Sequence, residues 1–139
     1  MQYWLFKSEA NTWSWDQQVA KGAAGEEWDG VRNYQARNFM RQMEIGDRGF
    51  FYHSLKEKSV VGIIEVCALA HPDSTTDDDR WECVDIKAVA PLKSPVTLEM
   101  VKTDPRLADM VLVRNSRLSV QPVTADEWAI VCQMGGLNV

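Results

Sequence analysis

The chain has 139 residues, of which 45% are hydrophobic and 25% are charged, and its formal net charge is -5. This length predicts one globular domain with a core of its own, so no disulfide or metal is required for folding. The negative charge excludes a protein that coats nucleic acid by bulk electrostatics, and any nucleic-acid site must be a local basic patch.

The three cysteines, Cys67, Cys83 and Cys132, are odd in number, far apart and set among apolar residues. They are typical of reduced packing residues, and they indicate neither a disulfide framework nor a zinc knuckle. No basic and apolar leader opens the chain, and the longest mostly apolar run, 60–70, is too short to span a bilayer. We therefore expect a soluble, cytoplasmic protein without a metal or another cofactor.

The first element expected is a buried strand over 3–6, which is rich in aromatic residues. It ends at Lys7, Ser8 and Glu9. Side chains at a strand end can face a cleft, although these three could equally form a plain solvated turn. Ser14 and Gln17 then have capping-box spacing, which predicts a short helix over 15–21 that stops at Gly22.

The stretch 28–38 is unusually dense in groups that recognise ligands. It holds an indole, a phenol, two guanidinium groups and two carboxamides, on Trp28, Tyr34, Arg32, Arg37, Asn33 and Asn38. Aromatic rings can stack on a flat ligand, and guanidinium groups match phosphate oxygens. The alternative is that Trp28 anchors the core and the arginines form a solvated helix face.

An amphipathic helix is expected to follow Gly30. Ala36, Phe39, Met40 and Met43 fall on one apolar stripe, whereas Asn33, Arg37 and Arg41 recur every four residues on another face. Gly46 and Asp47 should end this helix.

The next expected strand covers 49–54, with Phe51 and His53 on one face and Phe50, Tyr52 and Ser54 on the other. His53 could act as a base with Glu9 or Asp29. However, His71 has no metal-ligand spacing to it, which favours a hydrogen-bonded structural or pocket histidine.

Three more strands are expected over 60–70, 81–89 and 117–123. The first follows a charged hairpin at 56–58, Pro91 and Pro95 should punctuate the chain after the second, and Pro122 should mark an edge in the third. The acidic stretch 73–82 is typical of a solvated loop. Thr97, Asp104 and Thr124 are expected to begin short helices, and Trp128 should pack the last one on the core. The apolar strand over 60–70 favours a closed or nearly closed sheet.

Four blocks of the chain, 3–9, 28–38, 46–54 and 117–123, resemble in order the signature blocks of the EVE domain family. Ala10 is a small departure, since the family usually has proline there. The resemblance implies an α+β, PUA-like fold, in which a curved β pseudo-barrel is flanked by short helices, over the single domain 1–139. It also implies a relation to YTH and ASCH domains, whose pockets receive a nucleobase.

Carried over from YTH domains, the matching pocket positions here are Lys7, Ser8 and Trp28. Asn33, Glu9 and the backbone at Gly30 are candidates to read the edge of a base, and further residues are candidates for the pocket wall. These wall candidates are Val31, Tyr34, Tyr52, His53, Ser54, Leu118 and Ser119. Arg32, Arg37 and Arg117 are the candidates for binding flanking phosphates.

The function expected from these residues is non-enzymatic binding of a modified or flipped nucleobase in DNA or RNA, such as 5-methylcytosine, by a monomer. One alternative is an enzyme acting on a nucleotide or small molecule through His53 and a carboxylate. The other is a protein-interaction module. The sequence has no glycine-rich phosphate loop, no metalloprotease motif and no serine-hydrolase motif, so it offers the enzyme hypothesis no motif.

Overall fold

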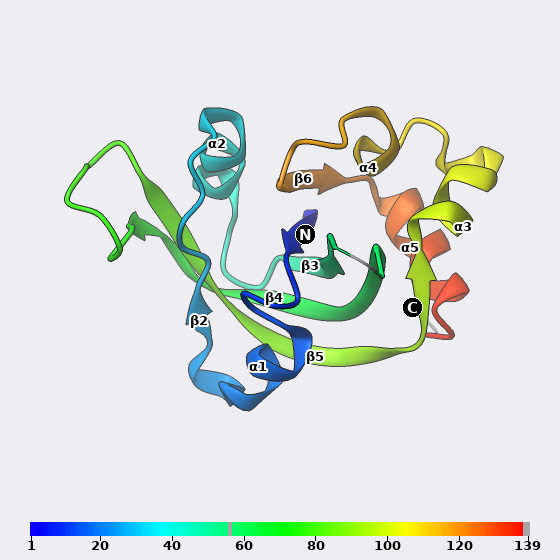
Figure 1. Ribbon diagram of the computed structural model, residues 1–139, viewed down its shortest axis with the longest axis horizontal. Helices are drawn as coiled ribbons and strands as arrows, with labels where there is room; N and C mark the ends of the chain where they lie inside the picture. Colours follow the sequence, from blue (N-terminus) through cyan, green and yellow to red (C-terminus); the bar gives the residue numbers. More distant parts are fainter. Residues whose placement is uncertain (56, 138–139) are drawn as a thin grey trace.

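The fold is built on one six-stranded mixed sheet, seen in a computed structural model that describes residues 1–55 and 57–137 (Figure 1). The strand order is β2-β5-β4-β3-β1-β6. The strands are β1 (Tyr3–Ser8), β2 (Glu26–Glu27), β3 (Arg48–His53), β4 (Ser59–Pro72), β5 (Glu82–Thr97) and β6 (Val120–Val123). β1 and β3 are parallel, and the other neighbours are antiparallel.

Short helices cover both faces of the sheet. They are α1 (Trp15–Ala20), α2 (Tyr34–Gln42), α3 (Leu98–Thr103), α4 (Val111–Arg114) and α5 (Ala125–Met134), with 3-10 turns at Gly22–Ala24 and Pro105–Leu107. No helix in the described ranges is long and apolar enough to cross a membrane. The mixed sheet with short helices on both faces confirms the predicted α+β, PUA-like class. The sheet is curved but not closed, because β2 and β6 are its two free ends.

The side chains of β3 divide the core into two clusters, one on each face of the sheet. Phe51 packs with residues of α1 and α2, whereas Phe50 and Tyr52 pack with residues of α3, α4 and α5. The predicted alternation along this strand is confirmed. Its consequence is that Tyr52 and His53 point to opposite faces.

Several predicted helix ends are confirmed at atomic detail. Ser14 and Thr124 both form complete capping boxes, and the Thr97 side chain accepts the Met100 N–H. The predicted stripe of α2 is buried at Ala36, Met40 and Met43, with Phe39 partly covered. Trp128 is buried in the second cluster, as expected.

Two predictions about the strands need correction, and a third is not tested. β5 runs on to Thr97 through Pro91 and Pro95, because β2 pairs with it only at Asp85 and Ile86 and the remaining edge needs no N–H donor. β6 begins only at Val120, and it lies at the sheet edge as Pro122 predicts. The predicted hairpin at 56–58 includes Lys56, which lies outside the described residues.

Candidate functional site

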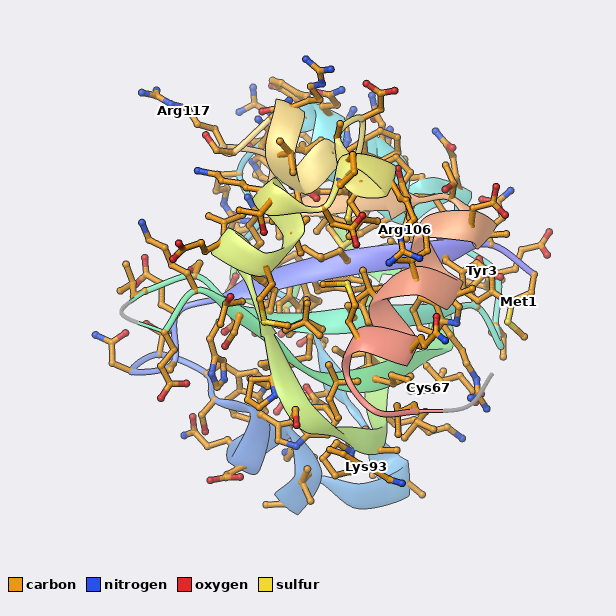
Figure 2. All side chains as sticks on the ribbon, turned by 90° about the vertical axis from the view of Figure 1, so that its right-hand side faces the viewer. Met1, Tyr3, Cys67, Lys93, Arg106 and Arg117 are labelled. Atoms are coloured by element: carbon orange, nitrogen blue, oxygen red, sulfur yellow. The ribbon has the colours of Figure 1, made fainter. Side chains whose placement is uncertain are left out.

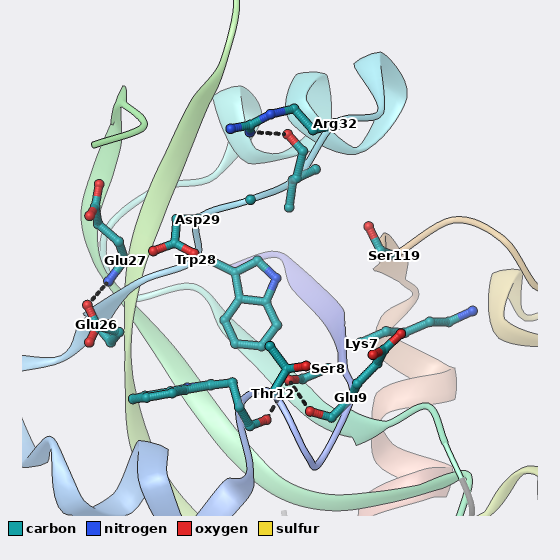
Figure 3. A pocket seen from close by; sticks show the side chains of 13 residues that line it. Lys7, Ser8, Glu9, Thr12, Glu26, Glu27, Trp28, Asp29, Arg32 and Ser119 are labelled. Atoms are coloured by element: carbon teal, nitrogen blue, oxygen red, sulfur yellow. Dashed lines mark hydrogen bonds between the residues drawn. The ribbon is translucent and has the colours of Figure 1, made fainter. Parts of the chain in front are cut away.

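A cavity of about 450 Å³ lies where β1 ends, beside the segment that joins β2 to α2 (Figure 3). This volume is within the range of cavities that hold small ligands. Its wall is formed by four separate segments of the chain. The lining residues are Lys7, Ser8, Glu9, Thr12, Trp13, Glu26, Glu27, Trp28, Asp29, Gly30, Val31, Arg32 and Ser119.

Trp28 is both a wall of the cavity and part of the core, so its predicted role as a core anchor is confirmed, and its stacking on a ligand stays a prediction. Its side chain is 7% exposed and packs edge-to-face against Phe6 and Phe51, at centroid distances of 5.3 and 5.6 Å. Its backbone N–H donates to the carbonyl of Val84. These contacts hold the indole at a fixed angle, as stacking on a flat ligand requires.

The turn after β1 brings Trp13 into the cavity wall. The Ser8 hydroxyl donates to the Trp13 carbonyl, and the Trp13 indole N–H donates to Gln18 Oε1 at 2.9 Å. Gln18 is fully buried and donates in turn to the carbonyl of Ile86. The predicted alternative of a plain solvated turn therefore does not hold for Ser8, which is buried and hydrogen-bonded.

Asp73 fastens the glycine turn of the cavity wall. Its carboxylate accepts from Gly30 N at 2.9 Å and from Arg32 Nη1 at 3.1 Å, and its other oxygen accepts from Thr75 N. Burial alone would raise the pKa of Asp73, but the hydrogen bonds from Thr75, Gly30 and Arg32 outweigh it and lower the pKa to about 2. The acidic stretch is thus not merely a solvated loop.

One wall of the cavity is acidic, which was not predicted from the sequence. Glu26 pairs with Lys21 at 3.1 Å, and Glu27 accepts from the backbone N–H and the hydroxyl of Ser74. Asp29 is different, because burial, followed by the charges of Asp73, Glu27 and Glu26, raises the pKa of its carboxyl. A hydrogen-bond donor on a ligand would stabilise this carboxylate.

Three side chains next to this wall could hold a metal ion. The donor atoms of Glu27, His71 and Cys83 all lie within 4.8 Å of one another. However, both ring nitrogens of His71 already face oxygen acceptors, since Nε2 lies 2.7 Å from Asp85 and Nδ1 lies 3.0 Å from the Pro72 carbonyl. Burial also raises the pKa of the Cys83 thiol, so a metal would have to displace its proton.

Seven of the thirteen residues predicted for the base pocket line the cavity. They are Lys7, Ser8, Glu9, Trp28, Gly30, Val31 and Ser119. Six lining residues were absent from that prediction, namely Arg32, which was predicted to bind phosphate, and Thr12, Trp13, Glu26, Glu27 and Asp29. Asp29 could have been predicted from the stretch 28–38. It directly follows Trp28 and precedes Gly30, and residues next to a glycine turn can line the same wall.

The other six predicted pocket residues do not line the cavity. Tyr52 and Leu118 are buried in the core, on opposite faces of the sheet, and the backbone N–H of Ser54 binds the Ser8 carbonyl. Asn33 is the N-cap of α2 and accepts the Ala36 N–H. Tyr34 is half exposed and stacks on Trp81 at a centroid distance of 5.0 Å.

His53 does not line the cavity, but it contacts the start of α1. Its Nε2 lies 3.2 Å from the backbone N–H of Trp15 and accepts it, which places the ring proton on Nδ1. Nδ1 lies 3.7 Å from the exposed carboxylate of Glu57 and has no hydrogen-bond partner among the described residues. This histidine therefore positions the start of α1.

The three predicted phosphate ligands have different surroundings. Arg32 lines the cavity and is paired with Asp73, whereas Arg37 donates to the carbonyl of Arg80 and lies over the Tyr34 ring. Arg117 is exposed and points away from the body of the molecule (Figure 2). Lys7 is a fourth cation at the cavity, where burial lowers its pKa and its ammonium group donates to the Ser116 carbonyl.

Comparison with known proteins places the chain in a family, since residues 2–134 match the EVE domain. The chain belongs to the EVE domain family. The EVE domain of this chain is 35% identical to thymocyte nuclear protein 1 of Mus musculus, over 95% of the chain and 73% of the mouse protein. The match to the human protein covers 77% of the chain and 58% of the relative, so the chain spans little more than half of its length.

Solved structures agree with the fold. A protein of Agrobacterium tumefaciens superimposes with a TM-score of 0.97 at 62% identity, covering 99% of this chain and 94% of that one. Human THYN1 protein in complex with DNA that contains 5-methylcytosine gives a TM-score of 0.92 at 32% identity, with all of both chains covered. A YTH domain of Zygosaccharomyces rouxii, at 15% identity and a TM-score of 0.60, shares the fold alone.

Proposed function

We propose that this EVE domain binds a modified or flipped nucleobase of DNA or RNA in the cavity beside Trp28, as a monomer and without catalysis. The observation that carries the proposal is an immobilised indole on the wall of a 450 Å³ cavity, in a chain whose human relative is bound to 5-methylcytosine DNA. A cavity of this kind suits a flat ring that enters edge first.

The energetics require more than stacking. Taking a base out of its stack costs a few kcal/mol, and stacking it on an aromatic side chain returns about 1–3 kcal/mol. The surplus has to come from hydrogen bonds inside the cavity and from phosphate contacts outside it. For the first, the cavity offers the carboxylates of Asp29 and Glu9. For the second, Lys7 lines the cavity, Arg37 lies on α2, which follows the lining residue Arg32 in the chain, and Arg117 lies just before the lining residue Ser119.

Binding is favoured over catalysis by the position of His53. The enzyme hypothesis pairs this imidazole with Glu9 or Asp29, but both carboxylates belong to the cavity lining and His53 does not. Its Nε2 is already used by Trp15 N–H. A general base has to reach the proton that it abstracts, directly or through one water.

The test measures binding of fluorescently labelled oligonucleotides that are unmodified, or carry 5-methylcytosine or N6-methyladenine at one position. We expect wild type to prefer one modified oligonucleotide, and Trp28→Phe to weaken that binding about 10-fold or more, because a phenyl ring offers a smaller stacking surface. Trp128→Phe is the matched control, since Trp128 is equally buried but lies in the other core cluster. Equal losses in the two variants, or no binding by wild type, would contradict the proposal.

A further inference from the structure

The hydrogen-bonding state of the cavity carboxylates points to the class of base that the cavity accepts. An ionised carboxylate can only accept hydrogen bonds. Glu26 and Glu27 are already supplied with donors, by Lys21 Nζ at 3.1 Å and Ser74 N at 3.1 Å. They are therefore part of the wall and need nothing from a ligand.

Asp29 has no such supply. Burial and neighbouring charges raise the pKa of its carboxyl, and no described residue donates a hydrogen bond to it. The charge of Arg32 stabilises the carboxylate, but that guanidinium is directed to Asp73 and Thr75. Asp29 thus lacks a donor in a wall that is already negative.

The position of Asp29 fits it for reading the edge of a stacked ring. It directly follows Trp28, and both side chains belong to the same cavity wall (Figure 3). We take a ring stacked on the indole to present its edge to this carboxylate. Glu9 is exposed as well, but it follows β1 and lies on the other side of the cavity (Figure 3).

We propose that Asp29 makes the cavity selective for bases that present an amino group at the read edge, such as cytosine and its 5-substituted derivatives, over bases with a carbonyl there, such as thymine. The inference rests on the proposed function and names the class of base. The cytosine amino group donates to the carboxylate, in the pairing that acidic residues make with cytosine in DNA grooves. The thymine carbonyl leaves two acceptors face to face, and a site built around a hydrogen bond rejects an analogue that lacks it.

The decisive pair of ligands is 5-methylcytosine and thymine, because they share the ring and the methyl group and differ in the hydrogen-bonding edge. Each is placed at one position of an otherwise identical labelled oligonucleotide. Single strands are compared, together with duplexes that carry an abasic site opposite, so that no base-pairing energy distinguishes the two ligands.

We expect wild type to bind 5-methylcytosine roughly 10- to 100-fold more tightly than thymine. Asp29→Asn should reduce this ratio to about threefold or less, because a carboxamide can rotate to donate to the thymine carbonyl as well as accept from the cytosine amine. Asp29 is exposed, so the variant is expected to fold. Glu99→Gln, which removes the same charge from an exposed position on α3, should keep the wild-type ratio.

The outcomes separate this inference from the proposed function. Equal binding of the two ligands by wild type, or an unchanged ratio in Asp29→Asn, overturns the role of Asp29 while base binding stands. Absence of binding to every oligonucleotide overturns the proposed function and the inference with it.

Discussion

At the scale of single residues, the four cations considered for phosphate binding fall into two groups. Arg32 is bound to the buried carboxylate of Asp73 and is needed to hold the glycine turn. Lys7 and Arg37 donate to backbone carbonyls, and Arg117 makes no ion pair with a described carboxylate. The charges of this second group are available to phosphate, which a protein with a net charge of -5 requires.

We therefore expect Arg117→Gln to weaken binding of modified and unmodified oligonucleotides by the same factor. The slope of log K against log salt should become shallower by about 0.7 to 0.9, since each phosphate contact contributes that much. Titrations at several salt concentrations measure both quantities.

Arg106→Gln is the matched control, because Arg106 is also exposed but is paired with Asp104 and does not lie beside a residue that lines the cavity. A loss in Arg117→Gln that is restricted to the modified oligonucleotide would instead place Arg117 in contact with the base.

At the scale of elements, the cavity depends on how α1 docks against the sheet. Trp15 packs edge-to-face on Phe51, its backbone N–H binds His53, and its ring lies directly over Gly62 of β4. A Cβ atom at Gly62 would lie under 3.0 Å from the six-membered ring of Trp15. Gly62 is therefore required for close approach, and it coincides with a shift in the register between β4 and β5.

Gly62→Ala is expected to destabilise the domain by about 1–3 kcal/mol, the usual cost of overpacking a core. Chemical denaturation monitored by circular dichroism measures this change. Trp13, which lines the cavity, lies just before Trp15 in the chain. A displaced Trp15 should therefore shift the cavity wall, and we also expect the variant to bind oligonucleotides less tightly.

The double variant Gly62→Ala/Trp15→Phe tests the cause. Phenylalanine lacks the ring atoms that would clash, so the alanine should cost less in the Trp15→Phe background than in wild type. Equal costs in the two backgrounds would show that the destabilisation has another origin.

At the scale of the whole molecule, two loops distant in sequence are joined by a single buried carboxylate. Asp73 lies at the end of the β4–β5 ribbon and binds the Gly30 turn that precedes α2. Its pKa of about 2 lies below the unfolded value of about 3.8, so its contribution to stability is complete above pH 4 and is lost as the pH falls toward 2.

Asp73→Asn should accordingly lower the free energy of unfolding by about 2 kcal/mol at neutral pH. The difference from wild type should shrink between about pH 4 and pH 2, as Asp73 of the wild type becomes protonated. Urea denaturation at a series of pH values measures it. Asp77→Asn, an exposed residue of the same loop, is expected to match wild type throughout, and a gap that persists unchanged at pH 2 would rule out this linkage.

Local signals in the chain predicted the helix caps, the buried stripe of α2, the alternation along β3 and the strand-end position of Ser8. These features depend on residues within a few positions of one another, so composition and spacing suffice to predict them. The resemblance of four sequence blocks also predicted the family and the fold, both of which are confirmed.

The composition of the cavity wall depended on the tertiary structure instead. Trp13, Glu27 and Asp29 meet Ser8 and Ser119 only because β1, β2 and β6 converge, and no local pattern encodes that convergence. Tyr52 and His53 do not line the cavity for a related reason. Both faces of β3 are covered, so its polar side chains are held by contacts with α1 and the second core cluster and do not reach the cavity.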